Sequence, residues 1–163
     1  MRLTVDTNCI NTKQAMPAMN TIERWEHERR VTLFRTQRSL MEVRNHPPAR
    51  AKVLDRPNVG EPAIADISFL DSDAYYDDAP GAAFDAIFKL LFRNLDPSKL
   101  LPESNHMTDV MHILSHQSSG NDIFVTTDND FLREAARLKA QWDITIMSPD
   151  ETVSHCQRVH GWT

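Results

Sequence analysis

Two acidic residues follow short apolar runs of the strand type. Asp6 comes directly after residues 3–5, and Asp128 comes two residues after the uncharged run 123–126. If both runs are parallel strands, their carboxyl ends share one edge of the sheet, where open α/β proteins bind their ligands. Carboxylates gathered there repel one another or stay protonated unless a cation joins them. The ions that suit such an oxygen-rich pocket are Mg²⁺ and Mn²⁺.

Two further acids lie in segments with helical spacing. Glu42 stands among apolar residues of a helix that Thr36 would cap, and Asp109 falls in the first turn of a helix over 105–116, where the helix dipole favours a carboxylate. A helix that begins near the carboxyl edge brings Asp109 beside Asp6 and Asp128. For Glu42 two alternatives stay open, because Glu23 and Glu26 lie on a neighbouring predicted helix.

The elements that must position these acids alternate along the chain. Periodicity and turn residues predict strands at 3–5, 31–34, 123–126 and 143–147, and helices at 22–30, 36–46, 82–94, 105–116, 131–138 and from 149 onward. Ser148, Pro149 and Glu151 form a capping-box signature for the last helix. This order predicts one α/β domain over 1–163, with three α/β/α layers and a mostly parallel sheet of four or five strands. Residues 46–104 are expected to form a variable helical and loop insertion.

The charges are unevenly distributed. The 163 residues carry a net charge of −5, with 18 basic and 23 acidic side chains. Between residues 24 and 56 nine basic residues outnumber four acidic ones, whereas residues 61–85 contain acids and no Lys or Arg. The first segment indicates a basic face for a polyanion, with Arg35, Arg38 and Arg44 as candidate phosphate ligands. Ordinary solvated surface is the alternative for both segments.

The remaining composition excludes several classes of protein. No run of about 18 apolar residues is present, and the chain shows no signal-peptide pattern, so we expect neither a membrane span nor export. The two cysteines, Cys9 and Cys156, make no disulfide framework. A cytoplasmic protein is the expectation.

The acids and their surroundings resemble those of a known family. Residues 3–8, Glu42, the helix of Asp109 and residues 125–131 are similar, in the same order, to the four-acid pattern of the PIN domain nucleases. The closing strand and residues 148–151 also resemble that family. The resemblance covers about residues 2–45 and 105–157 and leaves the middle of the chain unmatched.

The resemblance implies an activity and a set of roles. Asp6, Glu42, Asp109 and Asp128 would be catalytic in a Mg²⁺- or Mn²⁺-dependent endoribonuclease, a hydrolase of RNA phosphodiester bonds, with Asp6, Asp109 and Asp128 as metal ligands. Asn8 and Thr126 would orient ligands or water. Asp130 is an alternative fourth acid, which helix capping explains equally well. Small members of this family are often toxins neutralised by a protein antitoxin, and homodimers are common, so both partners are expected besides RNA.

Three alternatives compete with this interpretation. Asp109, His112 and His116 share a helical stripe and would form a zinc site with Cys156 or His160. A haloacid-dehalogenase-like phosphatase also has an aspartate after its first strand, but its motif requires a second one where this chain has Asn8. The third alternative is a catalytically silent PIN-like module that binds RNA or a protein.

Overall fold

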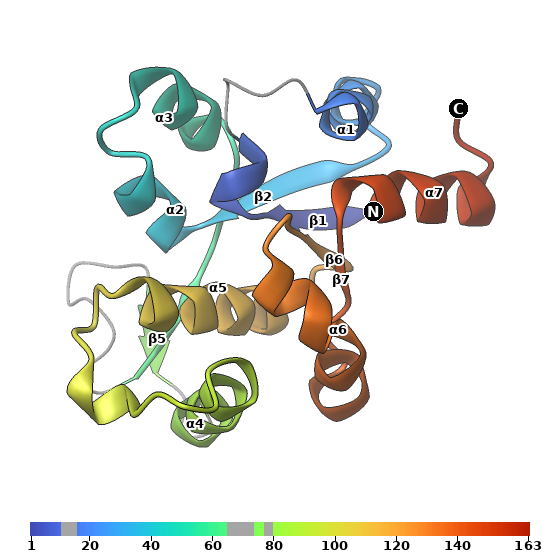
Figure 1. The fold of residues 1–163 in the computed structure, drawn as a ribbon. Helices are drawn as coiled ribbons and strands as arrows, with labels where there is room; N and C mark the ends of the chain where they lie inside the picture. Colours follow the sequence, from blue (N-terminus) through green and yellow to red (C-terminus); the bar gives the residue numbers. More distant parts are fainter. Residues whose placement is uncertain (11–15, 65–73, 77–79) are drawn as a thin grey trace.

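The chain folds as an α/β protein around a central sheet, as the sequence predicts (Figure 1). The computed structural model describes residues 1–10, 16–64, 74–76 and 80–163. Within this part of the chain the main sheet has five strands in the order β3-β2-β1-β6-β7, and every pairing is parallel. The prediction of a mostly parallel sheet of four or five strands is therefore confirmed.

The bounds of the elements are as follows. The strands are β1 (Arg2–Val5), β2 (Thr32–Thr36), β3 (Asn58–Val59), β4 (Glu61–Ala63), β5 (Ala74–Tyr76), β6 (Ile123–Val125) and β7 (Ile146–Met147). The helices are α1 (Pro17–His27), α2 (Gln37–Glu42), α3 (Pro47–Leu54), α4 (Pro80–Leu91), α5 (Asn105–Ser119), α6 (Asn129–Trp142) and α7 (Pro149–His160), and 3₁₀ turns are η1 (Thr7–Ile10) and η2 (Pro97–Lys99).

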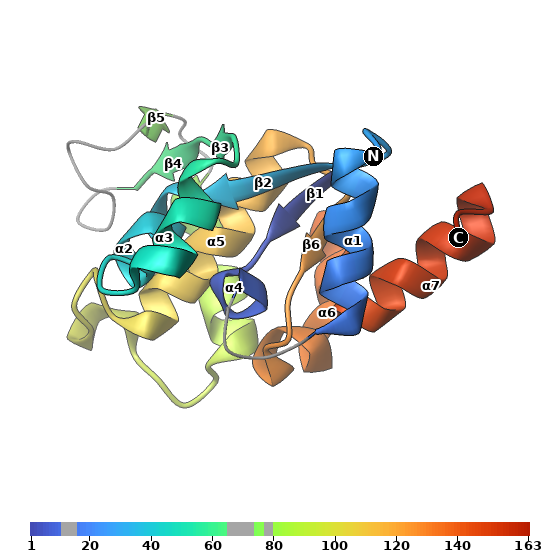
Figure 2. The same cartoon turned by 90° about the horizontal axis from the view of Figure 1, so that it is seen from above.

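Helices cover both faces of the sheet, which makes three layers (Figures 1 and 2). One apolar core joins Leu3 and Val5 of β1 to α1, α3 and α7, and the other joins Phe124 of β6 to α4, α5 and α6. Because successive strand residues point to opposite faces, Thr4 and Phe124 face α5 while Leu3 and Val5 face the other layer. By the same alternation, the side chain of Asp6 points to the face covered by α5, as Thr4 does.

The middle of the chain differs from the sequence prediction. The helix predicted for 36–46 already ends at Glu42. Pro47 instead begins α3 at the first helical position, where proline's missing N–H costs nothing. The next residues form β3, which pairs with β2, and Val53 and Val59 are buried. At least the start of the expected insertion therefore belongs to the core. The acidic stretch 71–78 falls largely outside the described residues.

The remaining boundaries shift by a few residues. α1 begins at Pro17 rather than near residue 22, and α4 ends at Leu91 rather than at 94. Asp109 lies beyond the first turn of α5, which starts at Asn105. In the parts of the chain that the structure describes, no helix combines the length and apolar character needed to cross a bilayer.

Candidate metal centre

Asp6 lies at the carboxyl edge of the sheet, between β1 and β6. Its backbone N–H donates to Val125 O at 2.9 Å, which continues the β1–β6 pairing by one residue. Thr126, directly after β6, donates its hydroxyl to Asp6 Oδ2 at 2.6 Å, and the Thr7 N–H donates to Asp6 Oδ1 at 2.6 Å. Both carboxylate oxygens are thus held by neighbouring donors, which fixes the orientation of this buried side chain.

Helix α5 brings two histidines against the same face of β1. His116 Nδ1 lies 2.9 Å from Thr4 Oγ1, and His112, one turn earlier, lies next to Asp6. Four helical residues rise about 6 Å, and two strand residues advance about 6.6 Å. The spacing of His112 and His116 therefore matches that of Asp6 and Thr4 on the facing strand.

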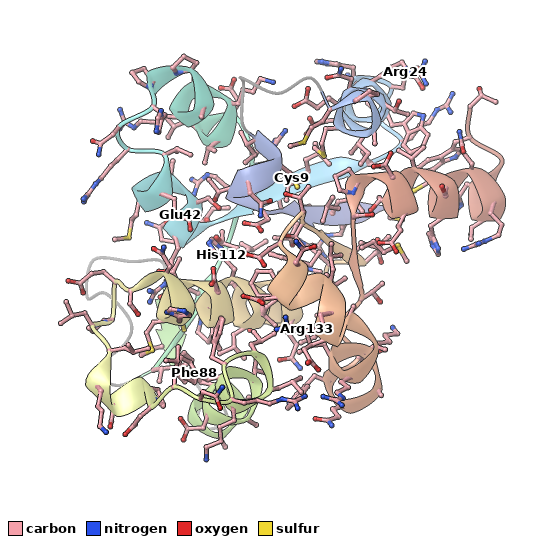
Figure 3. All side chains as sticks on the ribbon, in the orientation of Figure 1. Cys9, Arg24, Glu42, Phe88, His112 and Arg133 are labelled. Atoms are coloured by element: carbon pink, nitrogen blue, oxygen red, sulfur yellow. The ribbon has the colours of Figure 1, made fainter. Side chains whose placement is uncertain are left out.

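Glu42 reaches the site from α2 as the last residue of that helix. Its Oε2 accepts a hydrogen bond from the Thr7 hydroxyl and lies 3.3 Å from His112 Nε2. Figure 3 shows Glu42 and His112 next to each other, between α2 and α5. The alternatives Glu23 and Glu26 lie elsewhere: Glu23 binds Lys52 and Arg56, and Glu26 accepts from the Leu33 N–H.

Asp6, Glu42 and His112 form a close group of metal-ligating side chains. One ligand atom of each lies within 4.8 Å of the others, and no second such group occurs among the residues described. Donors on opposite sides of one Mg²⁺ ion are about 4.2 Å apart, twice the metal–oxygen distance. Because no two of the three ligand atoms are more than 4.8 Å apart, the group has about the right size for one divalent ion.

Asp109 and Asp128 stand around this group rather than within it. Burial raises the pKa of the Asp109 carboxyl to about 7; His112 opposes this rise, whereas the charges of Asp6, Asp128 and Glu42 add to it. The four predicted acids are therefore near enough to interact electrostatically. Such mutual repulsion in a partly buried site is relieved by protonation or by a cation.

The other shifts follow from the same crowding. Burial raises the pKa of Asp6, although His112 and the Thr126 hydrogen bond oppose this change. Burial favours a higher pKa for Glu42, but its contacts with His112 and Thr7 outweigh burial, so the pKa is lowered overall. Burial lowers the pKa of His112, yet the contact with Glu42 and the charges of Glu42, Asp6 and Asp109 raise it overall. Without a metal, the neighbouring acids favour the protonated form of His112.

At the second acidic tip the capping residue is Asp128, not Asp130. Asp128 Oδ1 accepts from the Asp130 N–H at 2.7 Å at the start of α6, while the Asp130 carboxylate pairs with Arg133 at 2.9 Å. Asn8 bridges the two tips, because its Nδ2 donates to Thr126 at 3.4 Å and its Oδ1 accepts from the Thr127 N–H at 3.3 Å. These contacts are those of residues that position Asp6 and Asp128.

The three arginines predicted to bind phosphate have different surroundings. Arg38 is only 1% exposed, and its guanidinium forms a two-point ion pair with Glu61, at 3.0 and 3.2 Å. The prediction that Arg38 contacts RNA is therefore wrong. Arg35 is half-buried and donates to Asn58 at 3.0 Å, whereas Arg44 is exposed.

Much of the expected basic face is also paired with acids. Within residues 24–56, local ion pairs engage basic side chains with glutamates: Arg24 and Arg30 with Glu28, and Lys52 and Arg56 with Glu23. Glutamates therefore neutralise part of the positive charge of this segment at the surface. Arg29, Arg44 and Arg50 remain exposed.

The zinc alternative is not supported by the geometry. His116 is buried against Thr4 and Phe124, and burial lowers its pKa to about 4. Cys156 belongs to the core on the opposite face of the sheet. His160 stacks on Trp162, with ring centroids 4.6 Å apart. Of the histidines proposed for zinc, only His112 joins the acids.

Two residues of the site have other roles than their sequence patterns predict. The patterns indicate His112 only as a zinc ligand and Thr36 only as a helix cap. Thr36 does occupy the N-cap of α2, but its hydroxyl makes no capping bond and instead contacts His112 Nδ1. The matched spacing of Thr4, Asp6, His112 and His116 is the signal in the sequence that could have found His112.

The donor set fits a divalent metal ion. His112 is 1% exposed, and although Nε2 lies near Glu42, it has no hydrogen bond of adequate geometry. A buried polar atom without a hydrogen bond is costly, and the carboxylates of Asp6 and Glu42 lie close to this imidazole. An ion between them would satisfy the imidazole nitrogen and relieve the repulsion among the acids.

Comparison with known proteins does not assign this chain to a family. The chain matches no family model and no curated protein.

Proposed function

We propose that this protein is a metal-dependent ribonuclease that hydrolyses phosphodiester bonds. The observation that carries the proposal is the convergence of Asp6, Glu42 and His112 at the carboxyl edge of a parallel sheet, with Asp109 and Asp128 in electrostatic contact. Ligand sites of open α/β sheets lie at this edge. The resemblance of the four acids to PIN domain nucleases supports RNA as the substrate.

Some residues of the site would bind the ion, and others keep the metal-binding side chains in position. Asp6, Glu42, Asp109 and Asp128 are the oxygen donors in the proposal. When bound, a divalent ion lowers the pKa of a water molecule to supply hydroxide and neutralises charge on the phosphate. The hydroxyl of Thr126 and the N–H of Thr7 keep the Asp6 oxygens in place, so that little reorganisation is needed for binding.

Proton placement follows from the environments of the acids. The Asp109 carboxyl, with a pKa of about 7, holds a proton in a large share of metal-free molecules at neutral pH. Glu42, with its lowered pKa, is ionised under the same conditions. The site thus combines an acid that can give up a proton near neutrality with a carboxylate, that of Glu42, which is already charged.

A cleavage assay with matched variants tests the proposal. The purified chain is incubated with labelled single-stranded and hairpin RNAs in Mn²⁺ or Mg²⁺, with EDTA and with DNA of the same sequence as controls. Cleavage of RNA that needs the metal and disappears in Asp6→Asn supports the proposal. The control is Asp150→Asn, which changes an exposed aspartate of α7 outside the site and should leave cleavage intact.

Two results of the assay contradict the proposal. Metal-independent cleavage that survives in Asp6→Asn would identify a contaminating nuclease. RNA binding without cleavage, equal in the wild type and in Asp6→Asn, would favour the silent binding module. The phosphatase alternative has less support, since Asn8 uses its side chain to bridge Thr126 and Thr127.

The antitoxin partner and the homodimer remain part of the proposal only through the family resemblance. Sedimentation of the isolated chain tests the dimer. Growth arrest on induced expression, relieved by coexpressing a candidate antitoxin and absent in Asp6→Asn, tests the toxin role. Normal growth with demonstrably active protein would contradict the toxin role without touching the nuclease activity.

A further inference from the structure

His112 gives the candidate centre a donor that carboxylate-only nuclease sites lack. Its ring is buried in α5, with Nε2 3.3 Å from Glu42 Oε2 and a ring nitrogen within 4.8 Å of an Asp6 carboxylate oxygen. The nearest contact of Nε2, Glu42 Oε2 at 3.3 Å, is not aligned as a hydrogen bond. A buried imidazole beside two carboxylates, with no aligned hydrogen bond at Nε2, is placed as a metal ligand would be once the ion replaces its proton.

The other ring nitrogen fixes which nitrogen carries the proton. Thr36 Oγ1 contacts His112 Nδ1 and lies 3.1 Å from Ser39 Oγ. If Nδ1–H donates to Thr36, and Thr36 donates to Ser39, Nδ1 keeps its proton and Nε2 is the nitrogen that can exchange its proton for a metal ion. Metal-binding histidines regularly donate their second N–H to a neighbouring group in this way.

Thr36 has given up a helix-capping bond for this contact. Threonine at an N-cap normally accepts from the backbone N–H of the second or third helical residue. Here α2 starts without that bond, and the hydroxyl turns to His112 instead. Because its hydroxyl makes no capping bond, Thr36 is available to orient the imidazole.

We propose that His112 Nε2 is a ligand of the metal ion, oriented by Thr36, and that the site therefore prefers first-row transition ions such as Mn²⁺ to Mg²⁺. Mg²⁺ favours carboxylates and water and seldom takes imidazole, whereas transition ions accept nitrogen and oxygen together. This inference rests on the metal-binding part of the proposed function. It deepens that function by naming the ion and the residue that selects it.

Binding and spectroscopy of Mn²⁺ test the inference without any assay of activity. Pulsed EPR of the Mn²⁺-loaded full-length protein should show coupling to a ¹⁴N nucleus, and growth on ¹⁵N-histidine should replace it with the ¹⁵N pattern. This measurement needs no variant and so does not depend on whether a mutant folds. Absence of nitrogen coupling in protein with bound Mn²⁺ would overturn the inference.

Variants then assign the nitrogen among the seven histidines. His112→Leu should remove the coupling and reduce the ratio of Mg²⁺ to Mn²⁺ dissociation constants by about tenfold or more. Thr36→Val should keep the coupling but weaken Mn²⁺ binding about 10- to 100-fold. The control is His116→Asn, which changes the adjacent buried histidine outside the group and should alter neither quantity.

The outcomes separate this inference from the proposed function. Mn²⁺ and Mg²⁺ binding that is unchanged in His112→Leu but lost in Asp6→Asn would overturn the histidine ligand and leave the carboxylate centre standing. Failure of the wild type to bind either ion at millimolar concentration would remove both.

Discussion

Thr126 donates a 2.6 Å hydrogen bond to Asp6, a residue 120 positions earlier in the chain. The same hydroxyl accepts from the Asp128 N–H at 2.9 Å. One side chain at the end of β6 thus joins the acidic tips of two neighbouring strands. The carboxyl edge of the sheet is therefore a single connected structure rather than two separate loop ends.

Removal of this hydroxyl should weaken the centre. Thr126→Val keeps the shape of the side chain but leaves Asp6 Oδ2 and the Asp128 N–H without their partner. We expect a loss of about 1–3 kcal/mol in the free energy of unfolding and a 10- to 100-fold loss of Mn²⁺ affinity. Denaturant unfolding and titration calorimetry measure these changes. Thr126→Ser should restore both, and failure of Ser to do so would argue against the hydrogen bond.

Metal binding should stabilise the fold through Asp6. A ligand at 100 times its dissociation constant adds about 2.7 kcal/mol to the free energy of unfolding, so Mn²⁺ should raise the melting temperature of the wild type and EDTA should reverse it. Asp6→Asn should lose this response. Because burial disfavours the charged carboxylate, the metal-free variant should be no less stable than the metal-free wild type. An equal Mn²⁺ response in both proteins would place the ion elsewhere.

Arg38 should matter for stability rather than for nucleic-acid binding. Arg38→Met leaves the fully buried Glu61 without its partner, and loss of one member of a buried pair costs about 3–5 kcal/mol. Chemical denaturation should detect this loss. The double change Arg38→Met with Glu61→Leu should recover much of it, while the exposed Arg44→Ala should change stability by less than about 0.5 kcal/mol. A marginal effect of Arg38→Met would contradict the structural role.

His116 should make stability depend on pH. Its pKa is about 4 in the folded chain against 6.5 in the unfolded one, so the unfolded chain binds the extra proton as the pH falls from 6.5 to 4. The free energy of unfolding should fall over that range by about 3 kcal/mol from this residue alone. Denaturation at several pH values measures it.

The matched variant isolates this contribution of His116. The raised pKa of Asp109 acts in the opposite direction, since protonation of that carboxyl favours the folded state as the pH falls from about 7. The comparison must therefore be the difference between wild type and His116→Asn, which keeps a polar group near Thr4 but does not titrate. A difference that is independent of pH would show that His116 titrates normally.

Local signals in the sequence identified elements whose ends are set by their own residues. Ser148 and Glu151 form the predicted capping box, with hydrogen bonds of 3.2 and 2.8 Å, because the four residues concerned are adjacent in the chain. Alternation in residues 3–5 and the uncharged run 123–126 likewise identified β1 and β6. Such patterns depend on period and propensity alone.

Local sequence patterns predicted the wrong role for polar side chains that bond to a residue far away in the chain. Thr36 has the type and position of a helix cap, but His112, 76 residues away, takes its hydroxyl. Arg38 belongs to a basic segment, but Glu61 draws it into the interior. Neither partner can be read from the neighbouring sequence, since both contacts depend on how α2 packs against the rest of the fold.

The sequence by itself determined the alternation of strands and helices and the acids at the strand ends, because periodicity and chain order carry that information. Only the tertiary structure decided which side chains meet. The order of strands puts Asp6 beside Thr126, and the position of α5 along β1 places His112, rather than His116, beside the acids. Contacts of this kind are fixed by packing across the sheet, which no local pattern specifies.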